Sequence, residues 1–170
     1  IRGGLSVVNT EYQANDIATK MANNSGHDYQ LLHAPDNIGK KALEELVKEP
    51  VVKNALDVIG RTSIIIHSIG NAFEMAHRRK SSMEVLKVLE DKKAVSESFG
   101  SYFDKDGKEV FKTSTIGMSF KDVDGINNVF TIVGGEKKAD AVYSYLCTKP
   151  ANATLIIDEA ICKKIIKKLV

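Results

Sequence analysis

The chain has 170 residues, of which 43% are hydrophobic and 27% charged, and these values are ordinary for one globular domain with a sizeable core. Its 24 basic and 22 acidic residues give a net charge of +2, so it offers no broad basic surface for nucleic acid. No apolar run approaches the roughly 18 residues of a membrane-spanning helix. We expect Cys147 and Cys162 to be buried thiols of a cytoplasmic protein, with no spacing that suits a metal.

The chain opens as though a strand had just ended. Arg2-Gly3-Gly4 is typical of a loop, and Thr10 is expected to cap a helix that runs to about Asn23. An α/β domain normally has a strand that feeds such a loop. We therefore expect residues 1–170 to form a single domain that lacks its first strand and loop.

The rest of the chain alternates between strand and helix patterns. The predicted strands cover residues 29–33, 62–69, 97–102, 109–112, 115–118, 129–133 and 153–157. The predicted helices cover residues 37–48, 51–59, 72–80, 82–90, 136–146 and 159 to the end. Asp106-Gly107 is a strong hairpin signal between two of the strands. This order predicts an α/β fold, Rossmann-like, with a mostly parallel sheet, helices on both faces and a small antiparallel hairpin.

Cationic residues recur beside glycine turns in this pattern. They are Arg2 beside Gly3-Gly4, Arg78 and Arg79 after Gly70, and Lys138 after Gly134-Gly135. Turns from parallel strands into helices meet at one edge of a sheet, where backbone N–H groups and helix dipoles favour an anion. Arginine can bind a phosphate through two donors, and lysine adds a compact charge. The convergence predicts a site for a phosphorylated small molecule.

Each of these features also has a purely structural explanation. A tight turn needs glycine for its backbone alone, and Arg79 could simply complement the dipole at a helix end. His67 lies in an apolar strand, where a hydrogen-bonded core histidine is the simpler interpretation. The sequence has no GxGxxG or Walker motif, no HExxH motif and no G-x-S-x-G motif, so we predict no catalytic residues, cofactor or metal.

Three carboxylates leave two functions open. Glu97 begins a predicted strand, where glutamate is disfavoured, and Asp158-Glu159 directly follow another strand. Facing a polyol, such groups would accept hydrogen bonds from hydroxyls, whereas in an enzyme they could be general bases. Asp158 could equally cap the helix that follows it. The role of these carboxylates therefore decides whether the chain is a binding module or an enzyme.

Several blocks together resemble one family of proteins. IIIHSIGNAFEMAHRR, with EYQAN, AVSESFGSYF, VGGEKKADAV and LIIDEA, is similar to the effector-binding domain of SorC-family bacterial transcriptional regulators, nearest to those that control central glycolytic genes. The similarity covers essentially the whole chain in the same order. It implies a fold like that of sugar-phosphate isomerases and glucosamine-phosphate deaminases. It also implies a sensor that binds a phosphorylated sugar, in the nearest relatives fructose 1,6-bisphosphate.

The resemblance assigns roles to individual positions. Arg2, Arg78, Arg79 and Lys138 would contact phosphate, Gln13 would donate its amide to phosphate or sugar, and Glu97 would accept hydrogen bonds from sugar hydroxyls. The sequence departs from the family pattern at Ser68, Ser98 and Ala160, none of which removes a proposed contact.

The resemblance also implies partners outside these 170 residues. Operator DNA would be bound through an upstream helix-turn-helix domain that this chain does not contain, by a homo-oligomer that is a dimer or a tetramer, without contact with a membrane. The alternative is an isomerase-like or deaminase-like enzyme that uses Glu97 or Asp158 as its base. The absent glycine fingerprints disfavour a nucleotide-binding protein.

Overall fold

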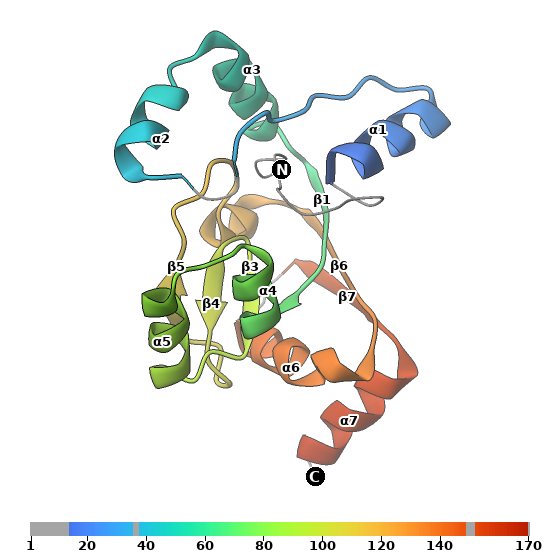
Figure 1. Ribbon diagram of the computed structural model, residues 1–170. Coiled ribbons are helices and arrows are strands. Elements are labelled where there is room, and N and C mark those ends of the chain that lie inside the picture. The colour runs from blue at the N-terminus through green and yellow to red at the C-terminus, as the bar shows by residue number, and fades with distance from the viewer. Residues whose placement is uncertain (1–13, 36–37, 149–151, 170) are drawn as a thin grey trace. The chain divides into compact units, whose positions relative to one another are not determined.

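The computed structural model describes residues 14–35, 38–148 and 152–169 (Figure 1). The candidate residues Arg2 and Gln13 lie outside these ranges. The chain divides into two compact units. Unit 1 comprises Ile1–Thr62 with Ser114–Met118, and unit 2 comprises Ser63–Thr113 with Ser119–Val170.

Unit 1 contains three described helices, which are α1 (Ala14–Ser25), α2 (Lys40–Leu46) and α3 (Pro50–Ile59). Pro50 opens α3, where its fixed φ suits a first helical turn and its missing N–H is not needed. The predicted boundary between α2 and α3 is therefore confirmed.

The core of unit 1 explains two wrong strand predictions. Its buried side chains are those of Leu32, Ala34, Val52, Ala55 and Ile116. Residues 29–33 and 115–118 were expected to be strands, but neither segment forms one. Leu32 and Ile116 from these segments are buried by packing within this cluster, which includes residues of α3, and not by pairing in a sheet.

Unit 2 contains a parallel sheet of three strands in the order β1-β6-β7. The strands are β1 (Ile64–His67), β6 (Asn128–Val133) and β7 (Ala153–Ile157). Ile65 pairs with Val129, and Thr131 pairs with Leu155. The helices that follow β6 and β7 are α6 (Ala139–Thr148), after the short 3-10 turn η2 (Glu136–Lys138), and α7 (Glu159–Leu169).

The two faces of this parallel sheet differ within unit 2. Val129, Thr131 and Val133 are buried on one face, where the Tyr145 hydroxyl of α6 contacts Thr131. On the other face Ile64, Ile66, Ile132 and Ile156 remain exposed. The α/β class is confirmed, and within this unit helical cover is seen on the first of these faces.

A second sheet in unit 2 is antiparallel, with four strands in the order β2-β3-β4-β5. The strands are β2 (Gly70–Asn71), β3 (Ser96–Ser98), β4 (Ser101–Phe103) and β5 (Glu109–Lys112). It is larger than the small hairpin that we expected. The single strand predicted at 97–102 is wrong, because Phe99 (φ 51°) and Gly100 (φ 80°) form a tight turn that divides it into β3 and β4.

Two helices pack on this antiparallel sheet. They are α4 (Ala72–Arg78) and α5 (Met83–Asp91). Their shared core consists of Ala72, Ala76, Leu89, Ala94 and Tyr102. The side chain of Ser82 caps α5 by accepting a hydrogen bond from the N–H of Val85.

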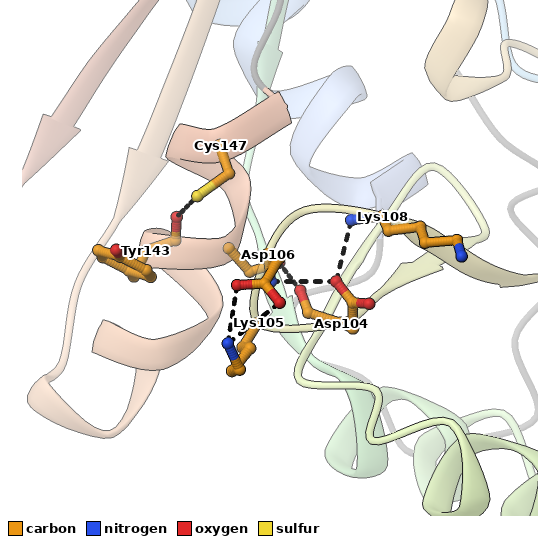
Figure 2. A network of polar contacts seen from close by, with 7 residues as sticks. Asp104, Lys105, Asp106, Lys108, Tyr143 and Cys147 are labelled. Atoms are coloured by element: carbon orange, nitrogen blue, oxygen red, sulfur yellow. Dashed lines mark hydrogen bonds and ion pairs between the residues drawn. The ribbon is translucent and has the colours of Figure 1, made fainter.

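The predicted Asp-Gly turn joins β4 to β5 (Figure 2). Asp104 Oδ1 accepts hydrogen bonds from the N–H groups of Asp106 and Lys108, each at 3.0 Å. Gly107 adopts a φ of 80°, and a Cβ there would lie 2.8 Å from Cβ of Cys147 on α6. The hairpin tip therefore packs closely on α6.

The prediction that both cysteines are buried is wrong. Cys147 and Cys162 are exposed on α6 and α7, and both are unbridged thiols. Cys147 donates a weak hydrogen bond along its own helix, to the carbonyl of Tyr143 at 3.5 Å (Figure 2). None of the helices among the described residues is long and apolar enough to cross a membrane.

Candidate functional site

The candidate site begins where β1 leads into α4. A Cβ at Gly70 would overlap the side chain of Met75, so a larger residue in this turn would force Met75 to move. The side chain of Asn71 caps α4 by accepting hydrogen bonds from the N–H groups of Phe73 (3.0 Å) and Glu74 (3.3 Å). These two N–H groups were expected to attract an anion, and they already have a partner.

Arg79 and Glu97 form a buried ion pair at the end of α4. Arg79 Nη2 lies 2.9 Å from Glu97 Oε1, and their side chains are 6% and 4% exposed. Arg79 Nη1 donates a second hydrogen bond, of 2.9 Å, to the hydroxyl of Tyr102 on β4. Arg79 therefore holds β3 and β4 together through two separate donors.

Burial and charge act in opposite directions on this guanidinium. Burial alone would lower the pKa of Arg79, and the nearby Glu97 carboxylate and Tyr102 oxygen more than offset that effect, so its pKa is raised. Burial raises the pKa of Tyr102, against the lowering effect of the Arg79 charge. Arg79 is a permanent cation here, and Tyr102 remains a neutral phenol at neutral pH.

Glu97 also determines the tight turn between β3 and β4. Its Oε1 accepts a 2.6 Å hydrogen bond from the N–H of Gly100, in addition to the bond from Arg79. Phe99, a bulky residue, has a left-handed backbone in this turn, a conformation that costs about 1–2 kcal/mol. The hydrogen bond to the Glu97 carboxylate offsets this strain.

His67, at the carboxyl end of β1, connects the parallel sheet to this turn. Its Nε2 lies 2.8 Å from Thr131 Oγ1 on β6, and its Nδ1 lies 3.5 Å from Ser98 Oγ on β3. The imidazole ring also packs against the Phe99 ring, with 4.8 Å between centroids. Burial lowers the pKa of His67 to about 4, so the ring is neutral at physiological pH. The expectation of a hydrogen-bonded histidine is confirmed.

The two neighbouring arginines differ in their surroundings. Arg78 is exposed to solvent, whereas the side chain of Arg79 is buried. Ala72 and Ala76 are the buried residues of α4, and Arg79 follows them at helical spacing on the same face. This spacing was the sequence signal that could have separated the two arginines, and the sequence reasoning did not use it.

The turn after β6 contains Lys138 and is held by Asp158. Asp158 Oδ2 accepts a 2.5 Å hydrogen bond from the N–H of Gly135, and its Oδ1 accepts one of 2.8 Å from the N–H of Ile161. These backbone hydrogen bonds lower the pKa of Asp158. Asp158 is therefore an N-cap for α7, which was one of the two roles left open. Lys138 lies half-buried in η2.

The predicted site residues are thus brought together only in part. Arg79 and Glu97 are directly paired, and Arg78 and Lys138 lie in the same unit without a hydrogen bond or ion pair to them. The sequence reasoning missed Tyr102 and His67 as partners of this site. No group of three or more histidine, cysteine, aspartate or glutamate side chains within the described ranges could hold a metal ion.

Comparisons with known proteins show which class of protein the chain is similar to. The structure is similar to that of a protein described as "the putative SorC family transcriptional regulator from Enterococcus faecalis", with a TM-score of 0.88 and 38% identity over 97% of this chain and 66% of that chain. The chain is also 39% identical to the central glycolytic genes regulator of Bacillus subtilis and 36% identical to that of Priestia megaterium. Each match covers 98% of this chain and 48% of the relative, so the chain spans about half the length of these relatives. The class is therefore that of domains from bacterial transcriptional regulators.

The family follows from a match over residues 1–167 to the sequence model described as "Putative sugar-binding domain". The chain belongs to this sugar-binding domain family. The resemblance to SorC-family regulators, inferred from the sequence blocks, is confirmed by these matches.

Proposed function

We propose that this chain is the effector-sensing domain of a cytoplasmic bacterial repressor of glycolytic genes, and that its effector is a phosphorylated sugar, fructose 1,6-bisphosphate. The observation that carries the proposal is membership of the sugar-binding family together with 39% identity to a glycolytic gene regulator over 98% of the chain. The charges of unit 2 support it, because they supply both anion donors and a carboxylate acceptor.

The proposed ligand contacts combine phosphate donors with sugar acceptors. Arg2, Arg78 and Lys138 would hold phosphate, Gln13 would donate an amide, and Glu97 would accept hydrogen bonds from sugar hydroxyls. The exposure of Arg78 suits a group that must reach an incoming anion. The burial of Glu97 suits a discriminating acceptor, because hydrogen bonds to a charged group are stronger away from water.

The proposed mechanism is a shift between two states of the regulator. An effector that binds one conformation or oligomeric arrangement more tightly moves the population toward it and changes operator affinity. Operator DNA would be bound by a helix-turn-helix domain outside this chain. A symmetric dimer or tetramer would present paired copies of that domain to paired half-sites.

An isomerase-like or deaminase-like enzyme is the less favoured alternative. The two carboxylates considered as general bases have structural hydrogen bonds, Glu97 with Arg79 and Gly100, and Asp158 with two backbone N–H groups. A base must accept a proton from substrate, and a carboxylate whose pKa is lowered, as at Asp158, is a poor acceptor. We therefore propose a sensor that leaves its ligand unchanged.

Thermal melting against a panel of sugar phosphates, with NMR of the recovered ligand, tests this function. A sensor gives a higher Tm with fructose 1,6-bisphosphate and returns it intact. Conversion of any panel member would instead establish an enzyme, and no shift with any of them would rule out the sugar-phosphate site.

The exposed arginine offers a sharper test of the same site. Arg78→Ala should weaken binding of the bisphosphate by about 1.5–3 kcal/mol, the scale of a lost hydrogen bond to a charged group. Isothermal titration of this variant beside Lys87→Gln, which removes an exposed charge on α5, separates a specific contact from a general loss of charge. Equal affinities for the two variants would place Arg78 outside the site.

A further inference from the structure

We propose that Arg79 is a positioning residue of the sugar-phosphate site: it fixes the Glu97 carboxylate and the β3–β4 turn, and does not itself contact phosphate. The effect on ligand affinity rests on the proposed function above. The effect on the turn stands on the geometry alone. The two adjacent arginines, both predicted from the sequence to contact phosphate, therefore have different roles.

Two of the five N–H donors of Arg79 are used within the protein, and the side chain is buried. Nη1 donates to Tyr102 and Nη2 donates to Glu97, each over 2.9 Å, and the side chain is 6% exposed. A phosphate would have to enter this buried space and would bring negative charge beside the Glu97 carboxylate. Two negative charges that lie side by side in a buried site repel each other strongly. Arg79 is therefore poorly placed to bind an anion.

The helix geometry explains why the two arginines have different surroundings. Successive residues of a helix point about 100° apart, so two adjacent arginines cannot both face the core. Arg79 continues the buried face of Ala72 and Ala76, and Arg78 is exposed. One arginine of the pair is thus committed to the interior, and the other is accessible to a ligand.

Glu97 transmits the position of Arg79 to the turn. Its Oε1 accepts hydrogen bonds from both Arg79 Nη2 and the N–H of Gly100, at 2.9 and 2.6 Å. That second bond holds Phe99 and Gly100 in left-handed conformations. If the guanidinium is lost, the Glu97 carboxylate loses a hydrogen bond and the positive charge beside it, so its position is less well fixed and its bond to Gly100 weakens. Arg79 thereby controls where an acceptor for sugar hydroxyls can lie.

Amide hydrogen exchange tests the positioning role without any ligand. In Arg79→Lys, which keeps the charge and loses the planar fork, exchange of the Gly100 amide should accelerate about tenfold or more, the effect of weakening a hydrogen bond to a charged group. The Asp106 amide in the β4–β5 turn should keep its rate, and Lys87→Gln should change neither. An unchanged Gly100 rate would overturn the proposal.

Ligand titrations then distinguish positioning from phosphate binding. For Arg79→Lys we expect affinity for fructose 1,6-bisphosphate to fall about 10-fold to 100-fold, while affinity for inorganic pyrophosphate, which has two phosphates and no hydroxyls, stays within about threefold. Parallel losses for both ligands would make Arg79 a phosphate contact and overturn the proposal. If wild-type protein bound no sugar phosphate, the proposed function would fail, and the exchange rates would still decide the role of Arg79 in the turn.

A double variant tests the same inference without leaving a buried charge that could unfold the protein. Arg79→Gln alone removes the positive charge beside the buried Glu97 carboxylate, whereas Arg79→Gln with Glu97→Gln places two neutral side chains there that can hydrogen-bond to each other. If Arg79 acts through Glu97, adding Arg79→Gln to the Glu97→Gln protein causes little further loss of sugar-phosphate affinity. A full additional loss would show that Arg79 acts independently, and would contradict the inference.

Discussion

The antiparallel sheet of unit 2 contains two tight turns that are stabilised in different ways. The β4–β5 turn is local: Asp104 accepts hydrogen bonds from N–H groups two and four residues ahead, and Gly107 supplies the left-handed backbone. The β3–β4 turn depends on Glu97, and Glu97 is paired with Arg79 from another element 18 residues earlier. We therefore expect changes in the local turn to leave the candidate site intact, whereas the β3–β4 turn includes a hydrogen bond to Glu97 of that candidate site.

Removing the carboxylate from the non-local turn should have the largest effect. Glu97→Ala leaves the Arg79 guanidinium and the Gly100 N–H buried without this acceptor, and should lower the free energy of unfolding by about 3–5 kcal/mol. Urea denaturation measures it. Glu109→Ala, an exposed glutamate on β5, is the matched control and should lie within about 0.5 kcal/mol of wild type. A loss below about 1 kcal/mol in Glu97→Ala would mean that the pair contributes little to the fold.

The local β4–β5 turn should be sensitive to substitution at Gly107. In Gly107→Ala the new Cβ would meet Cys147 Cβ at 2.8 Å, in a backbone with φ of 80° that alanine rarely adopts. We expect the free energy of unfolding to fall by about 2–4 kcal/mol, combining left-handed strain with overpacking. Sugar-phosphate affinity, measured below the unfolding transition, should be retained, because this turn is independent of Glu97. A selective loss of affinity would show that the two turns are coupled.

Lower pH should weaken the non-local turn through His67. Burial depresses the pKa of His67 to about 4, below its ordinary value of 6.5, so the unfolded chain binds the proton more readily than the folded one. Stability from this residue is complete above pH 6.5 and is lost as the pH falls toward 4, by about 2–3 kcal/mol. Urea unfolding from pH 7.5 to 4.0 measures the loss. His67→Asn should flatten the profile in this window, and an unchanged slope would show that other groups cause it.

The sequence predicted the local features well because their causes lie within a few residues. β7 spans the predicted residues 153–157, and the Asp-Gly turn lies where its pattern placed it. Each depends on backbone propensity, a cap or a turn residue that is visible in a short window.

The features that the sequence did not predict depend on distant partners. AVSESFGSYF has the pattern of one continuous strand, but a turn at Phe99 and Gly100 divides it in two, and that turn is held by the hydrogen bond from Gly100 to Glu97, which is paired with Arg79. The roles of Arg78 and Arg79 were likewise not separated, although Arg79 follows Ala72 and Ala76 at helical spacing and Arg78 does not. The family resemblance predicted which residues bind the ligand, and the packing shows that Arg78 is exposed whereas Arg79 is buried and paired with Glu97.

The smallest expected effect comes from the side chain that organises the local turn. Asp104→Ala removes two exposed hydrogen bonds to backbone N–H groups that water can replace, so the free energy of unfolding should fall by about 1 kcal/mol. The Gly100 amide should keep its hydrogen-exchange rate in this variant, because Glu97 and Arg79 are untouched. Asp104→Asn, which retains an acceptor oxygen, should recover most of the loss in urea denaturation. If Asp104→Ala instead accelerated exchange at Gly100 as strongly as Arg79→Lys, the two turns would form one cooperative unit, and the distinction between a local and a non-local turn would fail.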